Sequence, residues 1–368
     1  MTRRLVLVGA GHAHLETISR ARAFTEHGVE VALVAPDALF YCGTATGELG
    51  GSYGAGHGRI DVTSIARRAG VIVCAERATR LATAERTVYL ESGSKLAYDW
   101  LSLDLGASPR REFIPGLERE RVIPARPFSR LAGVRERLLA RDAPKLVVVL
   151  GGGAAGCEIA ANVKACREQT AVVLVDAAPR LFAGTRAGKL LESALLARGV
   201  ALILGRRVVG AQGDALQLDD QSVVRFDLLI NASGAAPSRL NQSSGLLLDE
   251  RGAVLVDTTL QSVKDPRVFA VGDCATRRGT WPQKNAVHAQ REGHVLFENL
   301  RRVIDGRAPV HCVWPERTLQ ILDLGDGSGV ALYGSWAHRS RAMLWWKRAR
   351  DRRWLSRWRA REGASRTP

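Results

Sequence analysis

Leu5-Val-Leu-Val-Gly9-Ala-Gly11-His-Ala-His14 and Leu146-Val-Val-Val-Leu-Gly151-Gly-Gly153-Ala-Ala-Gly156-Cys-Glu158 are the two stretches that decide the fold. Each begins with apolar, mostly β-branched or Leu residues, which are typical of a buried parallel strand. Each continues through a cluster of glycines into residues that favour a helix. A strand, a tight glycine turn and a helix N-terminus together present free N–H groups and a dipole that stabilise a bound anion. The sequence therefore predicts an α/β fold with two Rossmann-like, dinucleotide-binding units.

The two units differ in the residues that complete the pattern. In the first, His14 stands where a third Gly or Ala is usual, so we expect its helix to lie further from the strand or to be rotated. No acid directly ends the strand Val29–Val34, and only Asp37 is nearby. The second unit has Asp176, about 20 residues after its glycines, where a carboxylate bonds a ribose 2′-OH and repels a 2′-phosphate. This favours NADH over NADPH, although the nearby Arg180 keeps NADPH open.

A late motif and an internal repeat suggest how the units are connected. Val268-Phe-Ala-Val-Gly272-Asp273 again places an acid after an apolar strand. Residues 98–109 and residues 226–237 share one pattern, which is an aromatic-Asp pair, an apolar strand, Gly-Ala and Pro. The repeat predicts two similar domains, the second inserted in the first. We therefore predict a first domain of residues 1–110 and 238–306, a second domain of residues 111–237, and a separate tail of residues 307–368.

The tail carries much of the positive charge of the chain, which is +16 overall. We expect a hairpin around Asp326-Gly327, followed by a basic helix with several tryptophans. Residues 337–368 hold eleven Lys or Arg against two acids. Basic side chains beside indoles favour an anionic membrane surface, which residues 337–361 would contact. The alternative is a helix packed wholly on the core with a solvated arginine face; nucleic acid is not expected, since no motif supports it.

The six cysteines are scattered along the chain, and none is within three residues of another. This spacing excludes a C-x-x-C redox or zinc signature, and we predict no metal site. Cys42 follows the second strand in a region expected to line a bound nucleotide, but position 47 is Gly47, so the C-x4-C redox pair of disulfide reductases is absent. The glycine-rich segment Gly43–Gly58 is expected to be irregular.

At these residues the chain resembles the pyridine nucleotide-disulfide oxidoreductase superfamily, flavoproteins with two dinucleotide-binding domains. It is most similar to the branch of type II NADH dehydrogenases and sulfide:quinone reductases. Gly9-Ala-Gly-His-Ala-His14 and Leu101-Ser-Leu-Asp-Leu-Gly106 resemble a subgroup often found with selenide, water dikinase.

The resemblance implies two cofactors, FAD and NADH, and a set of residues for each. It places FAD against Gly9, Ala10, Gly11, His12, Asp37, Gly106, Gly272 and Asp273, and it places NADH against Gly151, Gly153, Gly156, Asp176 and Gly234. It also implies three catalytic residues, Glu158 between flavin and nicotinamide and Lys284 and Gln290 beside the flavin and quinone pocket. Ordinary roles stay open for them: a solvated first-turn Glu for Glu158 and a surface lysine for Lys284.

The expected function is transfer of a hydride from NADH to FAD and of electrons to a quinone-like acceptor. One alternative is a flavoprotein that oxidises sulfide or selenium compounds, for which Cys157 and Cys312 would have to meet near the flavin. The other is a flavin-binding redox-sensing or regulatory module. We expect a cytoplasmic protein, peripheral on the inner face of the cell membrane if the tail binds lipid, and a homodimer stays open.

Overall fold

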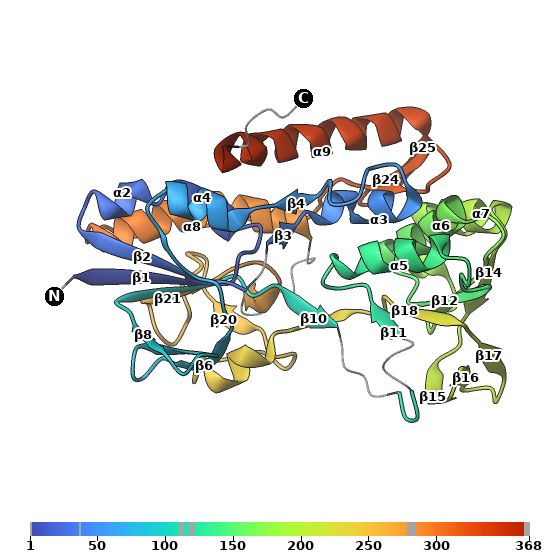
Figure 1. Ribbon diagram of the computed structural model, residues 1–368, viewed down its shortest axis with the longest axis horizontal. Helices are drawn as coiled ribbons and strands as arrows, with labels where there is room; N and C mark the ends of the chain where they lie inside the picture. The colour runs from blue at the N-terminus through green and yellow to red at the C-terminus, as the bar shows by residue number, and fades with distance from the viewer. Residues whose placement is uncertain (1, 37, 110–113, 118–121, 278–284, 364–368) are drawn as a thin grey trace.

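Two five-stranded parallel sheets form the centres of the molecule in the computed structural model, which describes residues 2–36, 38–109, 114–117, 122–277 and 285–363 (Figure 1). The first sheet has the order β21-β9-β1-β2-β5 and the second the order β11-β18-β12-β13-β14. The strands of the first are β1 (Arg3–Val8), β2 (Val29–Val34), β5 (Ile72–Cys74), β9 (Trp100–Leu103) and β21 (Val268–Ala270). Those of the second are β11 (Val122–Pro124), β12 (Leu146–Leu150), β13 (Ala171–Asp176), β14 (Val200–Leu204) and β18 (Leu228–Asn231).

The first sheet is covered on both faces, which explains why its strands are apolar on both sides. Successive side chains of a strand point to opposite faces, so Leu5 and Leu7 of β1 pack in one hydrophobic core and Val6 and Val8 in another. One face carries the helices α1 (His14–Ser19), α2 (Arg22–Thr25), α4 (Val62–Arg68) and α8 (Ala286–Ile304). The other carries an antiparallel sheet of β6 (Ala78–Ala82), β7 (Thr87–Leu90) and β8 (Lys95–Ala97).

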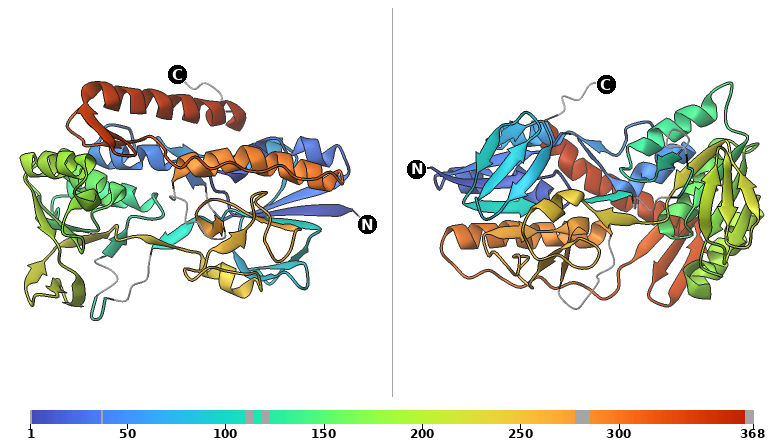
Figure 2. Two further views of the ribbon diagram at one scale, coloured as in Figure 1. Left: turned by 180° about the vertical axis from the view of Figure 1, so that it is seen from behind. Right: turned by 90° about the horizontal axis from the view of Figure 1, so that it is seen from below.

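The second sheet repeats this three-layer plan at the other end of the molecule (Figure 2). Val147 and Val149 of β12 pack toward helices, while Val148 packs on the opposite face. The helices are α5 (Arg130–Leu139), α6 (Ala154–Cys166) and α7 (Arg186–Ala197). The opposite layer is an antiparallel sheet of β15 (Val208–Gln212), β16 (Ala215–Leu218) and β17 (Val223–Arg225). The expected α/β class with two Rossmann-like units is confirmed.

The two repeated segments pair with each other between the units. Their Gly-Ala-containing ends form β10 (Ala107–Pro109) and β19 (Ala235–Pro237), which run antiparallel with Ser108 opposite Ala236. The chain thus leaves and re-enters the first unit along one short two-stranded ribbon. The remaining short elements are β3 (Leu39–Phe40), β4 (Arg59–Ile60), β20 (Val254–Val256), β22 (Ala275–Arg277), η2 (Leu181–Gly184), η3 (Arg239–Ser243) and η4 (Gly272–Cys274).

The expectation that the glycine-rich segment Gly43–Gly58 is irregular is wrong for its first half, which forms helix α3 (Cys42–Gly50). Glycine in a helix interior costs about 1 kcal/mol relative to alanine. Here the helix packs against α5 and α6 of the second unit, where Ala45 and Leu49 are buried. A Cβ on Gly50 would overlap the side chain of Asn162 on α6, so the glycine permits this close approach.

The tail is a three-stranded antiparallel sheet followed by one long helix. β23 (Gln320–Asp323) and β24 (Gly329–Tyr333) form a hairpin around Asp326-Gly327, and β25 (Trp336–Ser340) adds a strand that was not expected. Within the basic stretch, residues 337–340 pair with β24, so the expected helix begins after them. Helix α9 (Arg341–Glu362) then runs back across both units (Figure 1). Among the described residues, no helix has the length and apolar character needed to cross a bilayer.

Candidate functional site

A cavity of about 800 Å³ lies where the carboxyl ends of the first sheet meet the beginning of the second unit. This is the edge of a parallel sheet where ligands of such folds bind. Seven of the residues expected to hold FAD line it, from three separate segments of the chain: Gly9, Ala10, Gly11, His12, Gly106, Gly272 and Asp273. The walls also include the ends of β2 and β9, the first turn of α8 and residues 126–130 of the second unit.

The first glycine turn is shaped so that only glycine fits. A Cβ on Gly9, which has a φ of +93°, would overlap the backbone of Asp104, and one on Gly11 would overlap the Asp104 carboxylate. Backbone that approaches this closely, beside the start of a helix, suits the diphosphate of a dinucleotide. The residues present therefore fit FAD at this turn.

His14, which departs from the usual glycine pattern, is fully buried and joins the turn to the sheet. Its Nδ1 lies 2.7 Å from the carbonyl oxygen of Gly9, and its Nε2 lies 2.8 Å from the hydroxyl of Ser102 on β9. Burial lowers the pKa of His14 to about 4, so the ring is neutral at physiological pH. The side chain replaces the usual close glycine contact with two hydrogen bonds.

Asp104, at the end of β9, was missed by sequence reasoning although it lies at the centre of the site. Its Oδ2 accepts hydrogen bonds from the backbone N–H groups of Ala13 and His14, at 2.9 Å and 3.0 Å. It also lines the cavity. The only signal in the sequence is an acid in an otherwise apolar strand end, Leu103-Asp104-Leu105.

Asp273 reaches across the cavity to the second unit, where its carboxylate forms an ion pair with Arg126. The neighbouring Gly272 N–H donates to the buried Glu292 of α8 at 2.6 Å. Arg126 was also missed, because nothing in the sequence near it marks a site. The two units therefore meet through a charged contact at the mouth of the cavity.

His12 is enclosed between two aromatic rings, one of them from the tail. Its ring centroid lies 5.8 Å from that of Tyr41 and 5.5 Å from that of Trp354 on α9, and these two stack at 4.2 Å. Burial lowers the pKa of His12 to about 4, and its Nε2 makes no hydrogen bond within the described residues. Helix α9 thus covers one side of the first glycine turn.

The second glycine turn has the geometry expected of a nicotinamide-nucleotide site. Gly151 has a φ of +109°, and a Cβ on Gly156 would overlap the carbonyl of Gly151, so α6 packs directly on the turn. Asp176 ends β13 and accepts from the N–H groups of Gly152 and, at 2.7 Å, Ala178. Gly153 begins α6 with open space beside it, and Gly234, with a φ of +134°, precedes β19.

Glu158 is half-buried and lies away from the cavity walls, next to a buried polar cluster beneath α9. Its Oε1 accepts from the Asp323 N–H at 2.6 Å. Lys347 of α9 donates to the Asp351 carboxylate at 2.9 Å and to the Gly43 carbonyl. Burial raises the pKa of Glu158 to about 7, against the opposing effect of Lys347. The alternative of a solvated first-turn glutamate is therefore wrong, because the tail covers this side chain.

Two other expected residues, Asp37 and Lys284, lie outside the described residues. Gln290 is half-buried in the second turn of α8 and does not line the cavity, whereas Asn285, Ala286 and Ala289 of that helix do.

Within the described residues, Cys42 is the only cysteine on the cavity wall. Burial raises the pKa of its thiol to about 11, so it is protonated at neutral pH. Cys157 and Cys312 are buried in different hydrophobic cores, one in each unit. This arrangement counts against a disulfide relay between them. No cluster of three potential metal ligands occurs in the described ranges.

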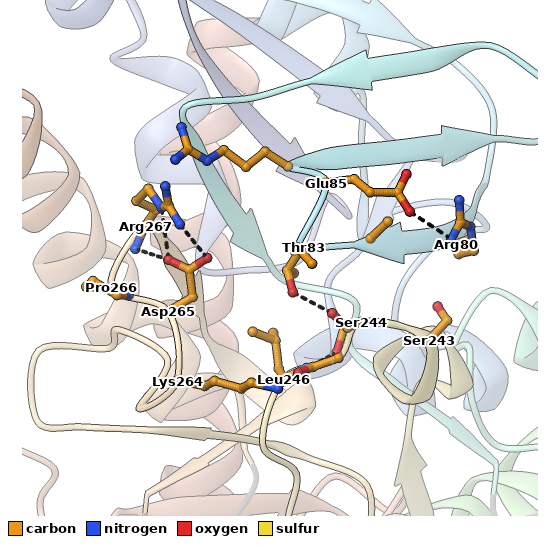
Figure 3. A pocket seen from close by; sticks show the side chains of 14 residues that line it. Arg80, Thr83, Glu85, Ser243, Ser244, Leu246, Lys264, Asp265, Pro266 and Arg267 are labelled. Atoms are coloured by element: carbon orange, nitrogen blue, oxygen red, sulfur yellow. Dashed lines mark hydrogen bonds and ion pairs between the residues drawn. The ribbon is translucent and has the colours of Figure 1, made fainter.

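A second cavity, of about 500 Å³, lies at the opposite layer of the first unit, beside the turn between β6 and β7 (Figure 3). Two ion pairs lie on its wall: Arg80 with Glu85 at 3.5 Å and Arg267 with Asp265 at 3.1 Å. None of the expected site residues lines it, so the cavity at the first glycine turn is the candidate active site.

The chain is similar to known proteins over most of its length. The pyridine nucleotide-disulphide oxidoreductase family matches residues 3–293. The chain is 33% identical over 205 residues to the nitric oxide reductase FlRd-NAD(+) reductase of Klebsiella pneumoniae, a match that covers 54% of this chain and 52% of the relative. It is 27% identical over 356 residues to ferroptosis suppressor protein 1 of Xenopus laevis, covering 90% and 89% of the two chains.

Solved structures share the fold over nearly the whole chain. The sulfide:quinone oxidoreductase of Aquifex aeolicus superposes with a TM-score of 0.77 at 14% identity, covering 98% of this chain and 92% of that one. The similarity therefore extends through the tail, which the family match does not reach. The first relatives are matched over about half of their own length.

Proposed function

The chain belongs to the pyridine nucleotide-disulphide oxidoreductase family of FAD-dependent NAD(P)H oxidoreductases, and we propose that it passes electrons from NADH through FAD to a quinone-like acceptor. Its cofactors are FAD and NADH. The cavity at the first glycine turn would hold FAD through Gly9, Gly11 and the Gly272-Asp273 segment. Bound there, FAD supplies the chemistry that accepts a hydride from NADH and returns electrons to an acceptor.

The second glycine turn would position NADH, and the surrounding charges support NADH over NADPH. Asp176 presents a carboxylate at the end of β13, where it would bond a ribose 2′-OH and repel a 2′-phosphate. Arg180 could have favoured a phosphate, but its guanidinium makes two hydrogen bonds to Glu192, at 3.2 Å and 2.9 Å. Glu192 therefore already engages the guanidinium that a 2′-phosphate would need.

The observation that carries the acceptor proposal is the position of α9 on the flavin side of the molecule. Trp354 stacks on Tyr41 beside His12, so the tail forms part of the surroundings of the first glycine turn. The same helix buries Lys347 and Asp351 near Glu158. An aromatic surface near one group that can exchange a proton at neutral pH suits an acceptor that takes up both electrons and protons.

Glu158 would hold and release a proton in this reaction, with Lys347 as a fixed positive charge near it. With its pKa raised to about 7 by burial, Glu158 can hold or release a proton at its carboxyl near neutral pH. Burial lowers the pKa of Lys347, but Asp351 and Glu158 outweigh that effect and raise it overall. Lys347 therefore stays charged, and Glu158 is the group that changes protonation.

We also propose that α9 rests on an anionic membrane surface from the cytoplasmic side. Its outward face exposes Trp345 by 67% and Trp346 by 42%, among several arginines. Indole and guanidinium groups together favour the headgroup region of a bilayer. The inward face buries Leu344, Leu355 and Trp358 against the protein, so one helix would serve both contacts.

A protein acceptor is the second candidate, and the net charge of +16 favours it. A basic surface attracts acidic redox proteins by electrostatic steering. A relative from Pseudomonas putida, 29% identical over 215 residues, is named a rubredoxin-NAD(+) reductase.

The test separates the two half-reactions in Glu158→Gln. We expect NADH to reduce this variant as fast as the parent protein, while reoxidation by a water-soluble benzoquinone slows by about 10²-fold or more, the usual contribution of a positioned proton donor. Reoxidation by ferricyanide, which takes no proton, should be unchanged. The matched control is Glu168→Gln, because Glu168 is exposed on the loop after α6.

Two outcomes of this stopped-flow experiment count against the proposal. Equal quinone rates in the variant and the parent protein would remove Glu158 from the reaction. Reoxidation of the parent protein by an acidic rubredoxin-type protein, with none by the quinone, would establish the second candidate instead.

A further inference from the structure

The buried carboxylate of Asp104 lies between the two chain segments that would hold the diphosphate of FAD. Its Oδ2 accepts the backbone N–H groups of Ala13 and His14. Its Oδ1 is 2.9 Å from the position that a Cβ on Gly272 would take, and its carboxylate fills the space beside Gly11. The side chain is 4% exposed and forms part of the cavity wall. A titratable group is therefore built into the anion-binding end of the site.

In the part of the chain that the structure describes, no positive charge pairs with this carboxylate: Asp104 makes no ion pair, and its hydrogen-bond partners are two neutral amides. The titratable or charged groups that face it are His14 on α1, Glu292 on α8, Asp273 on η4, and His12 and Arg126 at the cavity. Burial raises the pKa of Asp104 to about 7, and Glu292 and Asp273 add to this effect against the amides of His14 and Ala13. The group can therefore change its charge near physiological pH.

We propose that Asp104 takes up a proton when FAD binds, and thereby makes the affinity for FAD depend on pH. This rests on the proposed function only in taking FAD as the cofactor. An ionised carboxylate beside a diphosphate adds like-charge repulsion in a water-poor site. A protonated carboxyl removes that repulsion and gains an O–H that can donate to a phosphate oxygen.

The direction of the effect follows from linkage. FAD binding favours the protonated form, so the pKa of Asp104 is higher in the complex than in the free protein. Affinity is then greatest below the free-protein pKa of about 7. It falls by up to about tenfold per pH unit as the pH rises toward the pKa of the complex. His12 and His14, with pKa values of about 4, are neutral throughout this range.

The test is a titration of the flavin-free full chain with FAD, followed by quenching of flavin fluorescence, between about pH 6 and pH 9 at constant ionic strength. We expect the dissociation constant of the parent protein to rise at least about tenfold across this range. Asp104→Asn, which is nearly isosteric, should bind FAD with a dissociation constant that does not change with pH. Asp227→Asn is the matched control, because Asp227 also accepts two backbone N–H groups, from Lys145 and Leu146, but lies outside the cavity. It should keep the pH dependence of the parent protein.

A second measurement needs no variant and covers the case in which Asp104→Asn does not fold. Calorimetry of FAD binding at about pH 8 in buffers of different ionisation enthalpy gives the number of protons taken up. We expect a value between zero and one, clearly above zero. The absence of proton uptake, or the same pH dependence in Asp104→Asn as in the parent protein, overturns the proposal. A purely structural role would weaken FAD binding equally at every pH, which also contradicts it.

These experiments distinguish failure of this inference from failure of the proposed function. A protein that binds FAD independently of pH, yet is reduced by NADH and reoxidised by quinone, refutes this inference and leaves the function standing. If FAD binding is coupled to proton uptake but the protein does not turn over quinone, this inference stands and the proposed function is refuted. If FAD does not bind at any pH, both are wrong.

Discussion

The conformation of the first glycine turn depends on residues without side chains. Gly11 lies against the Asp104 carboxylate, and the methyl group of alanine would have to displace it. That carboxylate cannot move freely, because it is buried and accepts two amides of the turn. The turn and Asp104 therefore form one rigid unit.

Gly11→Ala should consequently weaken FAD binding by about tenfold or more and lower the free energy of unfolding by about 1–3 kcal/mol, the usual cost of overpacking. Fluorescence titration with FAD and urea unfolding measure the two effects. Gly54→Ala is the control, since a Cβ there would meet nothing within 4 Å. Unchanged FAD affinity in Gly11→Ala would mean that this turn does not approach the cofactor.

The residues that the sequence could not identify are those whose role depends on neighbours distant in the chain. The glycines of both turns were predictable because a glycine turn is a local pattern. Asp104 accepts hydrogen bonds from residues that lie about 90 positions earlier in the chain. It becomes part of the site only because β9 lies beside β1. Glu158 was expected beside the flavin, but its side chain contacts β23 of the tail. Local spacing alone cannot give these contacts.

Two elements differ from expectation for the same reason, which is tertiary packing. Helix α3 forms despite its glycines because they permit contact with α5 and α6. Strand β25, which was not expected, forms because residues 336–340 pair with β24 and complete the sheet. Intrinsic propensities are small compared with the burial that these contacts provide.

One face of helix α9 packs on the protein, and the other is exposed. Leu344, Lys347, Asp351, Leu355 and Trp358 are buried along one side. Trp345 and Trp346 lie on the exposed side, where they do not contribute to the core.

Replacing both exposed tryptophans by alanine should therefore abolish or strongly reduce binding to vesicles that contain anionic lipid, without lowering the unfolding temperature. Vesicle co-sedimentation at low and high salt is the measurement, and raised salt should also weaken the binding of the parent protein. Leu196→Ala, on α7, provides a control with an apolar side chain that is 57% exposed elsewhere. Equal sedimentation of the double variant and the parent protein would show that α9 does not mediate contact with lipid.

At the scale of the whole molecule, the tail joins the two units. The strands of the tail contribute Leu322, Leu324 and Val330 to the core of the second unit. Helix α9 contributes Leu355 and Trp358 to the core of the first. With the Arg126–Asp273 ion pair, these contacts fix the two glycine turns relative to each other. Transfer of a hydride between two bound nucleotides requires such fixed positioning.

The most direct test of this arrangement is the visible spectrum of the purified protein, recorded without oxygen while NADH is added. We expect a bound flavin whose absorption band bleaches within milliseconds to seconds, and more slowly with NADPH, since Asp176 would repel a 2′-phosphate. A flavin that stays oxidised in the presence of excess NADH would contradict it, because the two turns would then not bring the nucleotides together.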